Sequence, residues 1–272
     1  MFFLINTIED LLIGLCIGSF LNVVIYRLPN EMSILRPRSF CPKCKNLIPW
    51  QSNIPLVSFL IQKGKCSFCS TKISFRYPIV ELLTGLLFII FNSSSPYLYS
   101  FITYNPLEKL FTWFLLSILI AISFIDLDHF WIPQSLINFG FFIGLLNLLN
   151  VELFVNELSN ESFLLKGLFA SLGAYSVFES LRIISRKIFK KDALVKGDSK
   201  LVAMIALWLG PIGISFGIGI AYIIAAIFLI ISFQLKKIKK GQIIPFAPFL
   251  SIGGLIVWYF GNEYLIDFLY ML

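Results

Sequence analysis

Long apolar stretches alternate with short polar ones along the chain. Eight stretches are apolar enough to predict helices buried in a membrane, and they cover residues 8–26, 78–92, 110–125, 132–151, 163–181, 201–211, 213–234 and 246–270. A helix needs about 20 residues to cross a hydrocarbon layer of about 30 Å, so the second and sixth stretches are short and would be tilted or lengthened by flanking residues. The pattern predicts an all-α polytopic membrane protein with about eight transmembrane helices and a turn at Gly210-Pro211.

Composition agrees with this fold class. Of the 272 residues, 58% are hydrophobic, and the mean hydropathy is +0.86. A soluble domain of this length could not bury so much apolar surface, which excludes that class. The first apolar stretch has neither a basic segment before it nor a small-residue cleavage site after it. We therefore expect a first transmembrane helix over residues 1–27 and no cleaved signal peptide.

The charged residues predict how the helices are oriented. The formal net charge is +7, and 20 of the 22 lysines and arginines fall within residues 27–76, 182–200 and 236–240. Cytosolic loops of membrane proteins carry such an excess of basic residues. The three stretches are therefore expected on the cytosolic side of the lipid bilayer, and the positive charge does not indicate nucleic-acid binding.

Two Cys-x-x-Cys pairs lie in the first basic stretch. Cys41 and Cys44 are followed, after 21 intervening residues, by Cys66 and Cys69. Four thiolates at this spacing predict one tetrahedral zinc ion, and its role is expected to be structural because four ligands leave no open position for water. Thiols stay reduced in the cytosol, which agrees with the charge pattern. We expect residues 28–77 to form a small cytosolic zinc-binding domain.

Three carboxylates stand at the predicted cytosolic membrane surface. Asp126 and Asp128 end the third apolar stretch, and Asp198 begins the sixth. Ionisable groups at the membrane often carry function. Two carboxylates from separate segments can share a proton, so that one activates water while the other protonates a substrate carbonyl. The alternative is structural: Asp198 could stabilise the start of a helix, and Asp128 with His129 could form a solvated turn.

Six motifs, in this order, resemble those of the type IV prepilin peptidases, a bacterial family of intramembrane aspartyl proteases. They are the segment 18–29, which includes Asn22; the two cysteine pairs; the segment 74–85, which includes Glu81; Ile125-Asp126 with Pro133 seven residues after the aspartate; Gly197-Asp198-Ser199-Lys200; and the segment 244–254. The matches run the length of the chain.

The resemblance implies that Asp126 and Asp198 are the catalytic pair of an aspartic endopeptidase. Members of the family cut the basic leader from prepilin-like proteins, the pilins and pseudopilins, at the cytosolic face of the bacterial inner membrane. Many also methylate the new amino terminus with S-adenosylmethionine. The resemblance therefore implies a peptidase domain over residues 78–272, prepilin-like substrates, structural zinc, and S-adenosylmethionine as methyl donor.

The motifs also single out residues around the catalytic pair. The spacing to Pro133 favours Asp126 over Asp128 as the catalyst, and Asp128 is a candidate contact for the basic leader. Further residues expected to contact substrate or to shape loops are Asn22, Glu81, Gly197 and Lys200. Glu179, inside the fifth apolar stretch, is expected to be a structural partner of a basic residue.

Two positions depart from the family pattern. The first glycine of the family's Gly-x-Gly-Asp is Val195 here, which predicts a differently shaped loop before Asp198. The acid that follows the proline of the first catalytic motif is Gln134 here. Because that acid is not the family's catalytic carboxylate, we expect little loss of activity.

Two other functions fit the same sequence. One is a peptidase without methyltransferase activity, although the cysteine pairs favour the bifunctional enzyme. The other is a non-enzymatic scaffold or transporter with a zinc-ordered loop. Transporter sites lie near the middle of the bilayer, whereas the polar residues here gather at the predicted cytosolic face, which disfavours the second alternative.

Overall fold

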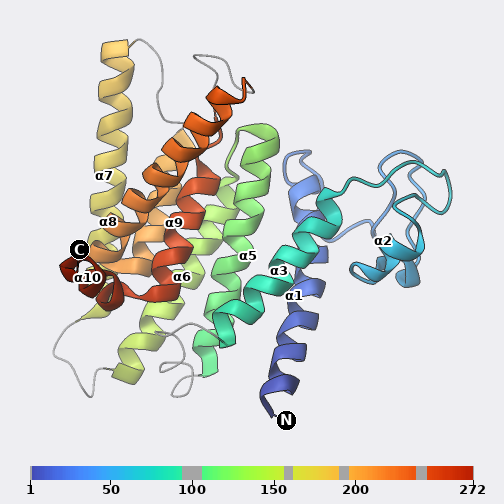
Figure 1. Ribbon diagram of the computed structural model, residues 1–272, viewed down its shortest axis with the longest axis horizontal. Coiled ribbons are helices and arrows are strands. Elements are labelled where there is room, and N and C mark those ends of the chain that lie inside the picture. Colours follow the sequence, from blue (N-terminus) through green and yellow to red (C-terminus); the bar gives the residue numbers. More distant parts are fainter. Residues whose placement is uncertain (1, 94–105, 156–161, 190–195, 237–243, 272) are drawn as a thin grey trace. The chain divides into compact units, whose positions relative to one another are not determined.

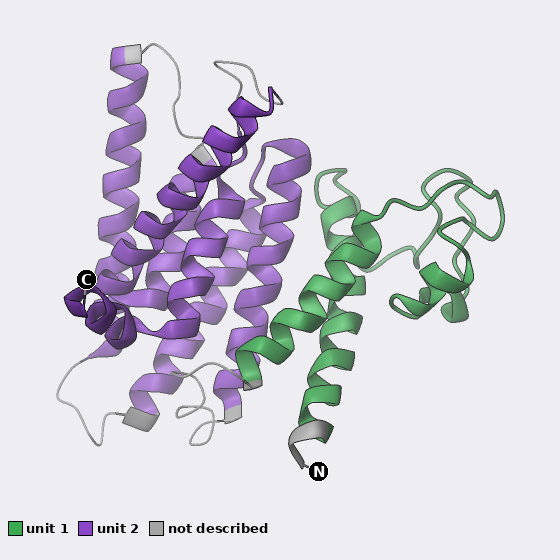
Figure 2. Ribbon diagram, in the orientation of Figure 1, with its two compact units in different colours: residues 1–94 green, residues 95–272 purple. Residues whose placement is uncertain are grey.

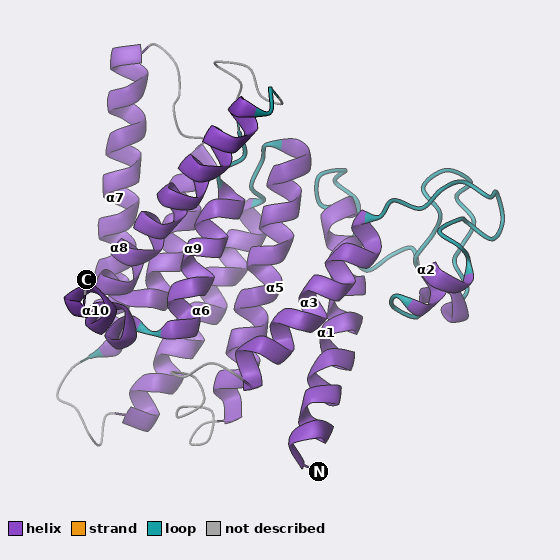
Figure 3. Ribbon diagram, in the orientation of Figure 1, coloured by secondary structure: helices purple, strands orange, loops and turns teal. Residues whose placement is uncertain are grey.

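The computed structural model describes residues 2–93, 106–155, 162–189, 196–236 and 244–271, and these residues form helices and turns without a β-strand (Figures 1 and 3). The chain divides into two compact units, Met1–Ser94 and Ser95–Leu272 (Figure 2). The all-α fold class predicted from the apolar pattern is confirmed.

Unit 1, residues 1–94, is built on two long helices that pack at close range. Helix α1 (Phe2–Arg27) lies against α3 (Arg76–Ser93), and the segment between them carries the short 3-10 helix η1 (Trp50–Asn53) and helix α2 (Val57–Ile61). A Cβ atom at Gly14 would lie 2.7 Å from Cα of Gly85, and one at Gly18 would lie 2.7 Å from Cα of Glu81. Glycines four positions apart on α1 thus let the two backbones approach, as in membrane-helix pairs.

The chain leaves α1 through a buried arginine. The Arg27 guanidinium lies over the Phe40 ring, 5.5 Å from its centroid. It also donates hydrogen bonds to four backbone carbonyls, at 2.8, 3.2, 2.7 and 3.2 Å, those of Ser33, Ile34, Pro37 and Arg38. A buried charge needs such partners. These bonds fix the path of the chain from the end of α1 to the first cysteine pair.

The predicted functional division into residues 1–27, 28–77 and 78–272 differs from the division by packing. Because α3 packs on α1, the boundary between the compact units lies after α3, at residue 94. The three-part division stays a prediction about chemical roles.

Unit 2, residues 95–272, is a helical bundle in which α8 (Lys196–Gln234) has the central place. It packs against α6 (Gln134–Val155), α7 (Phe163–Phe189) and α9 (Ala247–Phe260), while α5 (Pro106–His129) packs against α6 and α9. Every residue from 201 to 209 is buried. The first half of α8 is therefore the core of this unit.

Helix α8 reverses direction at Gly210. This residue has φ 72° and ψ −178°, a conformation that interrupts the helix and that glycine adopts without strain. Ile205 packs against Gly254 of α9, while Gly217 packs against the adjacent Gly253. In a straight helix residues 205 and 217 would be about 18 Å apart along the axis. The two halves of α8 are therefore arms that run in opposite directions, and the turn predicted at this position is confirmed.

The last apolar stretch, residues 246–270, is two helices rather than one. Helix α9 ends at Phe260, and α10 (Asn262–Met271) follows at an angle of 90°. Gly261 forms the corner with φ 79°, and its N–H donates to the carbonyl of Val257. A residue with a side chain would be strained at this φ, so glycine permits the bend.

Among the described residues, four helices are long and apolar enough to cross a membrane, or five if the bent pair α9–α10 is one span. The four are Ile5–Arg27, Leu107–His129, Gln134–Leu153 and Gly197–Gln234. The last of these contains both arms of α8, so it includes two of the predicted stretches. A protein of several membrane-spanning helices is supported, and the count of eight stays a prediction.

Two glycine substitutions should have opposite effects on stability, because one glycine is closely packed and the other faces open space. Gly14→Ala would push a methyl group into the α3 backbone and should lower the free energy of unfolding by roughly 1–3 kcal/mol. Gly173→Ala in α7, where nothing lies within 4 Å of the new Cβ atom, should raise it by roughly 0.5–1 kcal/mol. Thermal unfolding in detergent measures both. A melting temperature that is unchanged or raised by Gly14→Ala would contradict the packing described for unit 1.

Candidate functional site

Asp126 is buried near the end of α5, and the backbone of α9 supplies a hydrogen bond to it. Its Oδ2 accepts from the N–H of Ala247 at 3.0 Å. Ala247 is the first residue of α9, so its N–H has no partner within that helix. Pro248 follows at a position where proline favours the start of a helix. The start of α9 thus supports a carboxylate that would be costly to bury alone.

Asp198 is buried in the first turn of α8. Gly197, immediately before it, packs against Ile132 in the connection between α5 and α6. A Cβ atom at Gly197 would lie 2.9 Å from Cβ of Ile132, so this position has no room for a side chain. Ile132 follows Asp126 by six residues. The close approach of Gly197 therefore places the two aspartates at the same end of unit 2.

Aromatic residues connect the surroundings of the two aspartates. The centroid of the Tyr222 ring lies 5.3 Å from that of Phe246, which precedes Ala247. The Tyr222 phenol is also close enough to interact with the charge of Asp198. Contacts therefore join Asp126 to the start of α9 and the start of α9 to Tyr222 in the second arm of α8, and the Tyr222 phenol lies within electrostatic range of Asp198. Neither Ala247 nor Tyr222 was among the predicted site residues; proline on both sides of Phe246-Ala247 was the only local signal.

The neighbouring polar residues differ from the pair in burial. Asp128 and His129 are exposed at the end of α5, whereas Asp126 is buried. This difference supports the choice of Asp126 over Asp128 made from the spacing to Pro133. Glu179 forms an ion pair with Arg182 on the next turn of α7, as expected of a structural residue. Val195 lies outside the described residues.

Lys200 connects the first turn of α8 to α6. Its Nζ donates to Oε1 of Gln134, and Nε2 of Gln134 donates to Oδ1 of Asn138 at 2.7 Å. Gln134 stands where the family pattern has an acid. Its amide oxygen accepts the hydrogen bond from Lys200, an acceptor role that a carboxylate at this position could also fill.

A groove of about 530 Å³ in unit 2 includes Lys200 and Gln134 in its wall. The rest of the wall comes from α6, α7 and the first arm of α8 and is mostly apolar, with Ile137, Phe141, Leu145, Leu168, Leu172 and Leu207 among its residues. Because Lys200 follows Asp198 by two residues, this part of the groove wall is close in sequence to the buried carboxylate.

The four predicted metal ligands come together in unit 1. The sulfur atoms of Cys41, Cys44, Cys66 and Cys69 lie within 4.8 Å of one another, and those of Cys41 and Cys69 are 3.9 Å apart. Tetrahedral zinc with zinc–sulfur bonds of about 2.3 Å would place its ligands about 3.8 Å apart. The cluster therefore fits a single zinc ion.

The two cysteine pairs have the same backbone arrangement. In each, the first cysteine donates its N–H to the residue five positions later, Asn46 or Thr71, and accepts from the N–H four positions later, that of Lys45 or Ser70. Lys45 and Ser70 have φ values of 61° and 56°. The cluster is thus formed by two copies of one turn, each of which brings a pair of sulfur atoms to the shared centre.

A threonine next to the second pair favours the metal-binding form of one ligand. Sγ of Cys69 lies 3.3 Å from Oγ1 of Thr71, and this hydrogen bond lowers the pKa of the Cys69 thiol to about 6. The hydroxyl beside Cys69 thus favours its thiolate, which is the form that binds zinc.

Asn22 and Glu81 are buried in unit 1 beside the cysteine segment. Nδ2 of Asn22 donates to the carbonyl of Gly18 at 3.3 Å and to that of Tyr77 at 3.0 Å, which joins α1 to the start of α3. Oε2 of Glu81 accepts from the N–H of Leu56 at 2.8 Å, which joins α3 to the segment between the cysteine pairs. Both side chains line the same pocket.

Comparison with known families gives two matches. Residues 12–94 match the bacterial peptidase A24 N-terminal domain, and residues 113–230 match the type IV leader peptidase family. The first range lies in unit 1 and the second in unit 2. No solved structure matches the chain.

Curated relatives match over most of the chain. A prepilin leader peptidase/N-methyltransferase from Stutzerimonas stutzeri is 32% identical over 276 residues, which cover 93% of this chain and 90% of that protein. A type 4 prepilin-like proteins leader peptide-processing enzyme from Escherichia coli is 35% identical, with 90% and 91% covered. A prepilin leader peptidase/N-methyltransferase from Myxococcus xanthus is 40% identical over 72% of this chain, and the match spans 54% of that relative's length.

The cysteine cluster predicts one zinc ion per chain. Cys66→Ser removes one of four ligands and should lower zinc affinity by more than about tenfold, because even changes outside the ligand set cost that much. Metal analysis of the desalted protein measures the bound zinc. Cys16→Ser, at an exposed cysteine outside the cluster, is the matched control and should keep full zinc content. Equal zinc in the two variants would contradict the assignment.

Proposed function

Because the chain belongs to the type IV leader peptidase family, we propose that it cleaves the leader peptide from prepilin-like proteins and methylates the new amino terminus. The observation that carries the peptidase assignment is the pair of buried aspartates, Asp126 and Asp198, at one end of unit 2. The names of the relatives supply the substrate class and the second activity.

The two carboxylates have different roles in peptide hydrolysis, one as general base and the other as general acid. In the complex with substrate they share one proton, because two carboxylates brought together in a buried site do not both ionise. The ionised carboxylate takes a proton from water, whose oxygen attacks the scissile carbonyl carbon, while the protonated carboxylate gives its proton to the carbonyl oxygen. The tetrahedral intermediate then breaks at the C–N bond, and the amine leaves with the proton taken from water. The reaction needs no covalent intermediate.

The backbone around Asp126 suits this role. The N–H of Ala247 holds one carboxylate oxygen, Oδ2, and leaves Oδ1 for water or for the shared proton. Because this N–H belongs to the backbone at the start of a helix, its direction is fixed. The Asp126 carboxylate is therefore oriented before substrate binds. Asp198 is positioned in turn by the close packing of Gly197 on Ile132.

We place this site at the cytosolic face of the bacterial inner membrane. The basic stretch 182–200 contains Asp198, and the basic stretch 236–240 precedes the start of α9. Such stretches stay on the cytosolic side of a membrane. Both stretches adjoin the end of unit 2 that carries the aspartates.

The groove beside Lys200 is the proposed seat of the substrate's apolar helix. Its wall is mostly apolar, and it includes Gln134 and Lys200, of which Lys200 follows Asp198 by two residues. A prepilin-like substrate has a basic leader followed by an apolar helix, so a helix in the groove would bring the end of the leader to the carboxylates. Asp128, exposed at the end of α5, is our candidate contact for the positive charges of the leader.

Methylation needs a second ligand besides the substrate. When bound, S-adenosylmethionine would supply a methyl group from its sulfonium: the S–CH3 bond breaks as the uncharged amine nitrogen forms the N–CH3 bond, the amine then releases a proton, and S-adenosylhomocysteine leaves. Four thiol ligands leave zinc no open position, so we assign the metal a structural role in ordering the segment between α1 and α3.

The catalytic pair predicts the effect of two substitutions. Asp126→Asn and Asp198→Asn should each lower kcat for leader cleavage by at least roughly 10²–10⁴-fold, because each removes a group that transfers a proton. Cleavage of a prepilin-like substrate in detergent, followed by intact mass, measures this. Asp267→Asn, at an exposed aspartate of α10, is the control and should keep wild-type kcat. Cleavage at the wild-type rate by either catalytic variant would rule out the pair.

A shared proton also predicts the pH dependence of cleavage. The pair works only while one carboxylate is ionised and the other protonated, so kcat/KM should rise and then fall as pH increases. Initial rates over a series of buffers of constant ionic strength measure the profile. A rate that stays flat over several pH units would argue against a carboxylate pair as the catalyst.

A further inference from the structure

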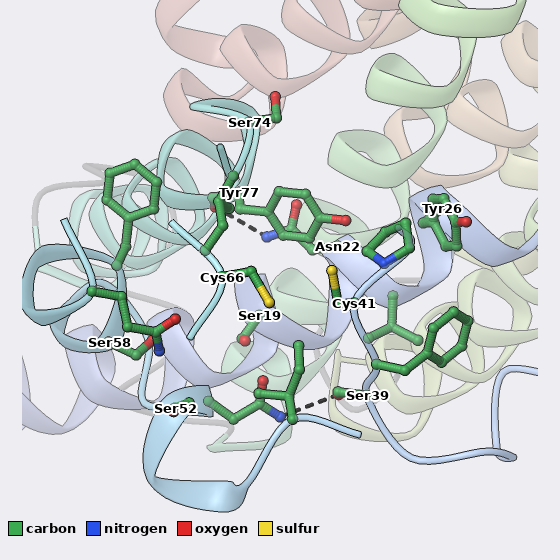
Figure 4. A pocket seen from close by; sticks show the side chains of 18 of the residues that line it. Ser19, Asn22, Tyr26, Ser39, Cys41, Ser52, Ser58, Cys66, Ser74 and Tyr77 are labelled. Carbon is green, nitrogen blue, oxygen red and sulfur yellow. Dashed lines mark hydrogen bonds between the residues drawn. The ribbon is translucent and has the colours of Figure 1, made fainter. Parts of the chain in front are cut away.

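Helix α2 exposes aliphatic side chains on the side that does not pack within unit 1. Val57, Leu60 and Ile61 are 47%, 73% and 76% exposed. Ser58 and Phe59, between them in sequence, line a pocket of about 700 Å³ that this segment forms with α1 and α3 (Figure 4). A helix at a water-facing surface has polar residues on its outer side. The outer side of α2 has only aliphatic ones.

The exposed apolar residues begin before α2. Trp50 in η1 is 67% exposed and Ile54 is 43% exposed. With those of α2, five large apolar side chains are exposed between residues 50 and 61, and we call Trp50, Ile54, Val57, Leu60 and Ile61 the apolar surface of unit 1. Single exposed apolar residues are common on proteins, whereas a group of them marks contact with another surface.

A hydrogen bond fixes the position of α2 along the helices of unit 1. Oε2 of Glu81 in α3 accepts from the N–H of Leu56, the residue before α2, at 2.8 Å. Glu81 lies where α3 touches Gly18 of α1. Gly18 precedes Arg27, the last residue of α1, by nine positions, which is about 14 Å of helix. Helix α2 is therefore beside the second half of α1 and not beyond its end, as Figure 1 also shows.

The pocket wall gives the same position for α2. Cys16 and Phe20 of α1 line the pocket together with Pro55 and Phe59. Both α1 residues lie within Ile5–Arg27, a helix long and apolar enough to cross a membrane. The segment between the cysteine pairs thus adjoins a part of α1 that lipid would surround.

We propose that the apolar surface of unit 1 inserts among the acyl chains of the cytosolic leaflet. Residues 50–61 then belong to the membrane-embedded part of the protein, while the rest of the segment between α1 and α3 lies in water. Insertion removes five large apolar side chains from water, and it places Trp50 at the depth where tryptophan is enriched in membrane proteins. The inference does not depend on cleavage or methylation.

The charges around the apolar surface favour lipid over protein as its partner. Residues 27–77 contain nine lysines and arginines and one acid, Glu31. Lys63 and Lys65 are exposed and follow α2 directly. Lysines beside an inserted segment reach the phosphates of anionic lipids. A second copy of the chain would instead bring the same positive charge against this surface, and so would a basic leader.

The test identifies what the apolar surface touches. A benzophenone amino acid, which bonds to neighbouring C–H groups under ultraviolet light, replaces Leu60, Ile61 or Leu35 in the full-length protein. Leu35 is the matched control, because it is 87% exposed and lies beyond the end of α1, in the stretch whose carbonyls bind Arg27. Each protein is placed in liposomes of phosphatidylethanolamine and phosphatidylglycerol, and intact mass and zinc content are measured. The labels at 60 and 61 should gain the mass of a phospholipid, and the label at 35 should gain none.

A measurement on wild type supports the comparison. A lipid-soluble aryl diazirine, dissolved in the same bilayer and activated by light, should label residues 50–61 more heavily than residues 31–38. If the substitutions at 60 and 61 cost the protein its zinc, this labelling pattern decides, and equal labelling of the two ranges overturns the insertion.

The other outcomes also contradict the proposal. Cross-links from position 60 or 61 to unit 2 or to a second copy would show that protein covers the apolar surface. A protein that keeps its zinc but forms no lipid adduct at 60 or 61 would show that the surface faces water. Equal lipid adducts at 60 and 35 would show that α2 lies no deeper than the rest of the segment.

Discussion

A carboxylate buried among apolar helices has to be given hydrogen-bond donors, and this requirement organises unit 2. The N–H of Ala247, without a helical partner at the start of α9, meets it for Asp126. Helix α9 can begin there because α8 reverses at Gly210, so that its second arm returns the chain to the end of the bundle where its first arm began. The same reversal puts Tyr222 near Asp198. One turn in the middle of α8 thus brings its second arm and the start of α9 to the end of unit 2 that carries the two aspartates.

In unit 1, too, polar groups inside the structure need hydrogen-bond partners, but here the side chains supply them to the backbone. Its central segment has little regular structure, and it is held by side chains that bond to its backbone. Arg27 binds four carbonyls and Glu81 binds one N–H, while four thiols converge on a metal position. The pocket exists because these interactions hold the segment over the ends of α1 and α3. The chain therefore combines two buried aspartates in a helical bundle with a cysteine-bearing segment held over the ends of α1 and α3.

Local patterns were sufficient to predict part of this structure. The apolar stretches predicted an all-α fold, cysteine spacing predicted a cluster of four ligands, and the glycine at 210 predicted a turn. The missed features depend on contacts between distant residues, such as that of Asp126 with Ala247, 121 positions away. The sequence gives little indication of the corner at Gly261. Two other glycines of the same apolar stretch, Gly253 and Gly254, lie inside the continuous helix α9. A glycine alone does not distinguish a bend from close helix packing.

The central claim is that leader cleavage and methyl transfer are separate chemistries in one chain, of which only the second uses a donor. A time course with a prepilin-like substrate, run with and without S-adenosylmethionine and followed by intact mass, tests it most directly. We expect the leaderless product at the same rate in both reactions, and a product heavier by one methyl group only in the reaction with donor. Cleavage that requires the donor, or a product that gains no mass in its presence, would contradict the claim.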